Sequence, residues 1–124
     1  MNFQDTLVKM LEAGAGAAKV HWNALRGFAE EEFKGLAESA AWLEADYLAD
    51  MAAAKLQADP AKRADMEGKA RLRAGLAFEN LELAADGLIT VAKADAKIAA
   101  QDAINSALGV LKGAVNQSIG IPLL

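Results

Sequence analysis

The stretch LQADPAKR, residues 56–63, is the sharpest break in a chain that otherwise has the composition of continuous helix. Asp59 is a favourable residue for capping the start of a helix, and Pro60 suits the first helical position. A proline also disfavours helical backbone at the residue before it. We therefore predict that one helix ends near Gln57 and that a second begins at Pro60.

Two apolar stripes with helical spacing precede this break. Apolar residues recur every three or four positions over residues 3–28 and again over residues 33–54. Joining the two stripes requires a step of five residues, which shifts the phase. The pattern predicts a helix over residues 2–26 and a bend or short loop near Gly27. The alternative is one continuous helix that absorbs the shift over a wide apolar face.

A third stripe follows the break, from Ala70 to Val91. The leucines at positions 72, 76 and 83 widen this stripe, so we expect this helix to be buried on more than one side. A fourth stripe over residues 104–115 is out of phase with the third, which predicts another break between Lys93 and Lys97. The last helix is expected to end near Gln117, because Gly and Pro in the segment SIGIPLL oppose helix.

The fold class follows from these stripes together with the composition. The chain contains two prolines and few β-branched residues, and no segment has the pattern of a strand. We predict an all-α fold: a single-domain helical bundle of about four helices, or two long hairpinned helices, with no sheet. The domain is expected to cover residues 1–124, with helices in residues 1–117 and an apolar carboxyl-terminal tail in residues 118–124.

Composition also narrows the classes of function. The chain has no cysteine, so it can form neither a disulfide nor a thiolate metal site, which fits a reducing compartment and predicts a cytoplasmic protein. A net charge of −4 gives no general attraction to nucleic acid, so no nucleic-acid partner is expected. The longest low-charge stretch, residues 103–124, is too polar for a transmembrane segment.

No catalytic motif can be assembled from the side chains. His21 is the only histidine, which leaves no Glu-x-x-His pair for a metal and no His-based triad, and we interpret it as a core or interface residue. The carboxylates that a metal-binding bundle would use are Glu44, Glu79 and Glu82. We predict that the protein is not an enzyme and has no catalytic residue, metal or cofactor. A carboxylate-metal helical-bundle enzyme is the least favoured alternative.

Charged residues divide unevenly at the Asp59-Pro60 break, with the acidic excess before it and several lysines and arginines after it. If the two flanking helices form an antiparallel hairpin, Asp46 would pair with Arg71 and Glu44 with Arg73. Exposed pairs of this kind contribute about 0–1 kcal/mol each, so they would set the register more than the stability.

The carboxyl-terminal tail is the feature that a self-contained monomer explains least. A chain terminus is disordered by default unless it docks, yet this one is strongly apolar. It either folds back over its own bundle or fills a groove on another subunit. The predicted interface combines the tail with the last helical stripe, and its residues are Leu108, Leu111, Val115, Ile119, Ile121, Leu123 and Leu124.

The leading hypothesis is a non-enzymatic helical interaction or assembly protein. It would self-associate as a homo-oligomer through Ala-rich, coiled-coil-like helix faces and the apolar tail, as a component of a phage or another macromolecular assembly would. The alternative is a membrane-surface or lipid-interface protein with peripheral membrane contact, because the first and last helices are amphipathic. The acidic first half of the chain counts against that alternative.

Overall fold

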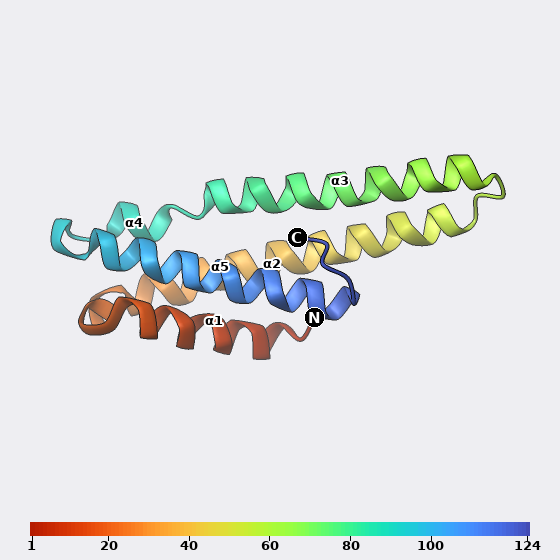
Figure 1. The fold of residues 1–124 in the computed structure, drawn as a ribbon. Helices are drawn as coiled ribbons and strands as arrows, with labels where there is room; N and C mark the ends of the chain where they lie inside the picture. The colour runs from red at the N-terminus through yellow and green to blue at the C-terminus, as the bar shows by residue number, and fades with distance from the viewer.

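The chain is helical almost throughout, and the all-α prediction is confirmed. The computed structural model describes residues 1–124 and contains no strand (Figure 1). The three long helices are α2, α3 and α5, and they are accompanied by α1 and the single-turn α4. The bounds are α1 Phe3–Ala18, η1 Lys19–His21, α2 Trp22–Lys55, α3 Pro60–Ala84, α4 Gly87–Val91, η2 Ala94–Ala96 and α5 Lys97–Ile119, where η marks a 3₁₀ turn.

The break at Asp59-Pro60 is confirmed, and the structure gives its local cause. The Asp59 carboxylate accepts a hydrogen bond from the Ala61 backbone N–H at 2.9 Å, and Pro60 opens the first turn of α3. The guanidinium of Arg63 donates twice to the Gln57 carbonyl, at 2.8 and 3.0 Å, which ties the end of α2 to the start of α3. These bonds fix α2 and α3 as an antiparallel hairpin.

The predicted bend near Gly27 is wrong, because the chain breaks earlier, at η1. Lys19 adopts a left-handed φ of 53°, and α2 then runs without interruption from Trp22. The buried face of α2 passes through Ala29, which is fully buried, whereas Phe28 is 54% exposed. When Ala29 takes the place of Phe28 in the buried stripe, the step to Phe33 is four residues instead of five, and the phase shift disappears.

The third helix also stops sooner than its stripe predicts. A turn at Ala85 and Asp86 separates α3 from α4. The break predicted between Lys93 and Lys97 is confirmed, since η2 lies there. Helix α5 extends two residues past Gln117 and ends at Ile119, and the following Gly120 has a φ of 85°, which is typical of a glycine that terminates a helix.

The helices divide into a body and a hairpin. Helices α1, α4 and α5, together with the part of α2 that they contact, form what we call the body. Helix α3 makes its substantial contacts with α2 alone. Figure 1 shows the turn end of the α2–α3 hairpin extending past the body, so part of the hairpin has no third helix against it.

The body core depends on one close approach between helices. A Cβ atom placed on Gly14 in α1 would lie 2.9 Å from Cε2 of Phe33 in α2, so any larger residue there would force the Phe33 ring to shift. A Cβ on Gly16 would meet nothing within 4 Å. Of the small residues in α1, Gly14 is therefore the one that lets the two helices come together.

No helix of the structure is both long enough and apolar enough to cross a bilayer.

Candidate interaction surface

The first candidate surface is a row of leucines on the outside of α3. Leu72, Leu76 and Leu83 are 62%, 50% and 79% exposed, and we call these three residues the outer strip. The expectation that this helix is buried on more than one side is therefore wrong. Helix α3 buries a single face, and the outer strip lies on the opposite side of the helix. The buried residues are Ala70, Ala74, Phe78 and Leu81.

Charge is distributed along α3 against the helix dipole. Residues 60–73 contain five lysines and arginines against two acidic residues, while residues 74–84 contain two glutamates and no basic residue. Helix dipoles favour the reverse order, with acidic residues at the amino end. Lys69 pairs with Asp65 within the helix at 3.0 Å, but Glu79 and Glu82 form no ion pair. The acidic half of α3 thus has no basic partner in its own chain.

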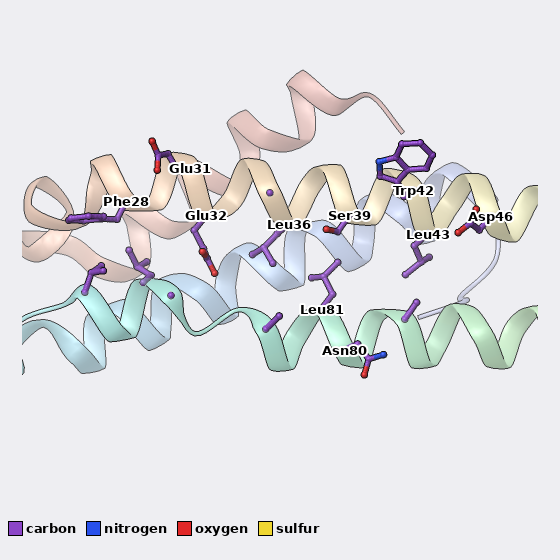
Figure 2. Close-up of a pocket in the computed structure, with 16 residues that line it drawn as sticks. Phe28, Glu31, Glu32, Leu36, Ser39, Trp42, Leu43, Asp46, Asn80 and Leu81 are labelled. Atoms are coloured by element: carbon purple, nitrogen blue, oxygen red, sulfur yellow. The ribbon is translucent and has the colours of Figure 1, made fainter.

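The second candidate surface is a groove of about 860 Å³ between α2 and the α3–α4 segment. Leu36 and Leu43 from α2 and Leu81 from α3 point toward one another across its floor (Figure 2). Its rim carries exposed apolar side chains: Phe28 is 54% exposed, Trp42 72% and Val91 46%. The remaining lining residues are Glu31, Glu32, Gly35, Ser39, Asp46, Ala77, Asn80, Ala84, Gly87 and Leu88.

The groove is electrostatically one-sided. Three carboxylates, those of Glu31, Glu32 and Asp46, line it, and no lysine, arginine or histidine does. None of the three takes part in an ion pair. Figure 2 shows Glu32 pointing from α2 toward α4, inside the groove. The groove is therefore apolar at its floor and acidic at its edge.

Sequence reasoning did not select the rim of this groove. Trp42 falls between the stripe residues Ala40 and Leu43 and is out of phase with both, which is the signal that could have identified it. A tryptophan outside the buried face of an amphipathic helix is exposed, and tryptophan is enriched where proteins bind one another.

The predicted pairing of Glu44 with Arg73 is replaced by a pair between Asp50 and Arg73, at 3.1 Å. Side chains lean toward the amino end of their own helix. On α3 this direction takes Arg73 toward the hairpin turn, and on α2 it takes Asp50 away from the turn, so the two meet. The predicted Asp46–Arg71 pair is not formed, and Asp46 lies in the groove.

Glu44 instead faces the body. Its carboxylate lies 3.1 Å from the amino nitrogen of Met1 and accepts a hydrogen bond from the Ser118 hydroxyl. The Met1 amino group also donates to the Ser118 hydroxyl at 2.8 Å. Glu44 is thus a buried, paired carboxylate that joins the chain terminus, α2 and α5.

The three carboxylates considered for a metal do not come together. Glu79 and Glu82 are exposed on α3, while Glu44 is occupied on the body side of α2. No group of three or more histidine and carboxylate side chains is arranged to hold an ion.

The apolar tail lies against its own chain. Ile119, Leu123 and Leu124 pack on the core while remaining partly exposed, and Ile121 is 36% exposed. The Leu124 backbone N–H donates to the Asn116 side chain at 2.8 Å, which holds the end of the chain beside α5. The tail therefore has the folded-back arrangement within its own chain, and its predicted contact with another subunit stays a prediction.

The other predicted interface residues lie inside the body. Leu111 and Val115 are fully buried and Leu108 is 8% exposed, because α5 packs against both α1 and α2. The predicted interface at these three positions is therefore internal.

No protein-family model, no curated protein and no solved structure matches this chain.

Proposed function

We propose that this chain is a non-enzymatic helical assembly protein that associates with further copies of itself through the outer strip of α3. The observation that carries this proposal is the exposure of three leucines on a helix that packs against only one neighbour. Large apolar side chains gathered on one exposed face are typical of interaction sites.

The charges of α3 favour a second copy as the partner. In an antiparallel pair of α3 helices that brings the outer strips together, the last basic residues of each helix would lie beside the acidic half of the other. Such a pair would place Leu72 near Leu83 of the partner, and Arg71 near Glu82 of the partner. Contacts of this type are reciprocal around a two-fold axis, which makes one surface complementary to itself.

The size of the contact sets the expected strength. Full burial of a leucine contributes about 1.5–3 kcal/mol, but association costs about 4–15 kcal/mol of lost freedom. Two single helices also bury less surface than a standard stable interface. We therefore expect a dimer that forms at high protein concentration and dissociates on dilution.

The membrane-surface alternative has less support. It depended on free amphipathic faces of the first and last helices, and both α1 and α5 bury their apolar faces against each other and α2.

Sedimentation equilibrium over a series of concentrations tests the proposal. The wild-type chain should show a reversible increase in mass, and the L72S/L76S/L83S variant should stay monomeric. The matched control is V20S/I98S, which removes two apolar side chains that are 88% and 79% exposed but lie outside α3. A wild-type chain that stays monomeric, or a control that dissociates equally, would contradict the proposal.

Single cysteines test the orientation, because the chain contains none of its own. In an antiparallel pair, L76C lies near the two-fold axis and should cross-link to its own copy with a short bifunctional maleimide. A61C lies at the opposite end of α3 from its copy and should not. Cross-linking of both variants would indicate a parallel pair instead.

A further inference from the structure

The groove between α2 and the α3–α4 segment is a separate surface from the outer strip, and its shape matches a helix. Along α2 it runs from Phe28 to Asp46, about 27 Å at a rise of about 1.5 Å per residue. A helix of about 18 residues has the same length. Phe28 and Trp42 stand toward the two ends of this path, and Gly35 and Ser39 lie between them.

Small side chains make the middle of the groove accessible to another backbone. A Cβ atom on Gly35 would meet nothing within 4 Å, so the space above it is open. Ala77 and Ala84 line the opposite wall on α3. The distance between packed helices is set by the side chains at the contact, and small ones allow the closest approach.

The groove also defines the chemistry of its occupant. Its floor of buried leucines and its exposed rim of Phe28, Trp42 and Val91 require an apolar stripe. Its three unpaired carboxylates, with no basic residue among the lining, favour lysine or arginine beside that stripe. An amphipathic helix laid into a groove is a recurrent mode of peptide recognition.

Segments of this chain are poor candidates for the occupant. The tail is held beside α5 by the Leu124–Asn116 hydrogen bond. The apolar faces of α1 and α5 are buried in the body. The basic half of α3 contains a single leucine, Leu72, which lies on the outer strip away from the groove of its own chain, and in a second copy the outer strip is already used by the proposed self-association.

We propose that this groove binds an amphipathic helix of a different protein, with an apolar stripe flanked by lysine or arginine. This inference goes beyond self-association, because it uses a different face of the hairpin. The chain would then hold a partner helix on one side of the hairpin and a second copy of itself on the other.

The probe is a synthetic helical peptide of about 18 residues, built from leucine on one face and lysine on the other. The matched probe carries glutamate in place of lysine. Isothermal titration calorimetry with the full-length chain should detect binding of the lysine peptide, weakened by added salt, and no binding of the glutamate peptide. Equal binding of both peptides, or of neither, would overturn the proposal.

Variants of the chain locate the binding site. G35L should fill the groove without disturbing the fold and reduce affinity for the lysine peptide by about tenfold or more, which corresponds to the loss of a central contact. The matched control is G68L, because Gly68 is also exposed on a helix with nothing within 4 Å of a Cβ and lies outside the groove. It should bind as the wild type does.

Two further variants keep the proposal testable if G35L does not fold. W42S removes an exposed rim side chain, and D46K reverses an exposed charge at the far end, so both should fold and both should weaken binding. Unchanged affinity in W42S and D46K would overturn the proposal. It would also be overturned if G35L abolished self-association, because the occupant would then be a second copy.

Discussion

Helices α3 and α5 have nearly the same length, 25 and 23 residues, but α5 buries seven residues and α3 buries four. Both sequences carry more apolar residues than one buried face needs. Helix α5 packs against α1, α2 and α4, whereas α3 packs against α2. The number of neighbouring helices, and not apolar content alone, therefore determines how much of each helix is buried.

This difference has a physical consequence for function. The leucines of α5 contribute to folding, because water is excluded from them in the monomer. The leucines of the outer strip keep much of their contact with water in the monomer, so they become buried only when α3 associates with a partner. Helix α3 is the element of this fold that can gain most from a partner.

The largest expected effect is the difference in stability loss between two leucine truncations, one in α5 and one in α3. Leu111→Ala in α5 should lower the free energy of unfolding by about 2–5 kcal/mol, because Leu111 is fully buried and the change leaves a cavity. Leu72→Ala in α3 should change it by no more than about 0.5 kcal/mol at a concentration where the chain is monomeric. Urea denaturation of both variants gives the values. Equal losses would mean that α3 is as buried as α5.

A second test compares the ion pairs of the body and the hairpin. Glu44→Gln should cost about 1–3 kcal/mol, because it leaves the buried Met1 amino group without its charged partner. Asp50→Asn breaks the exposed pair with Arg73 and should cost at most about 1 kcal/mol. Thermal unfolding at low and high salt distinguishes them, since salt should reduce only the second effect. A larger loss of stability for Asp50→Asn than for Glu44→Gln would contradict the description of Glu44 as the buried pair and Asp50 as the exposed one.

A smaller effect is expected from adding a methyl group to the body. Gly14→Ala places a Cβ atom 2.9 Å from the Phe33 ring, and the ring must shift, at a cost of about 1 kcal/mol or somewhat more. Gly16→Ala is the control, and it should stabilise the chain by about 0.5–1 kcal/mol because alanine favours helix over glycine. Stabilisation by both substitutions would show that α1 and α2 are less tightly packed than described.

The sequence predicts much of this fold because several signals are local. The cap at Asp59, the proline after it and the glycine at position 120 each act on their own neighbours, and the corresponding helix ends are where they were expected. The bend near Gly27 failed for a different reason. Ala29 and Phe28 are adjacent, and periodicity alone favours the larger side chain, although packing selected the smaller one.

The candidate surfaces were not predictable in the same way. Periodicity identifies Leu72, Leu76 and Leu83 as apolar residues on a helix, but only the arrangement of the helices leaves their side uncovered. The groove likewise requires α2 to lie beside both α3 and α4, which the sequence pattern does not specify. Counting residues from the turn pairs Glu44 with Arg73. Side chains lean toward the amino end of their own helix, so Arg73 contacts Asp50 instead.

Hydrogen exchange at two protein concentrations tests the central claim most directly, because it reports on α3 and α5 in the same molecule. At low concentration the backbone amides of α3 should exchange faster than those of α5, since α3 has fewer packing partners. At high concentration the amides of α3 around Leu72 to Leu83 should become more protected, while those of α5 stay unchanged. Protection of α3 that equals that of α5 and does not change with concentration would contradict the account.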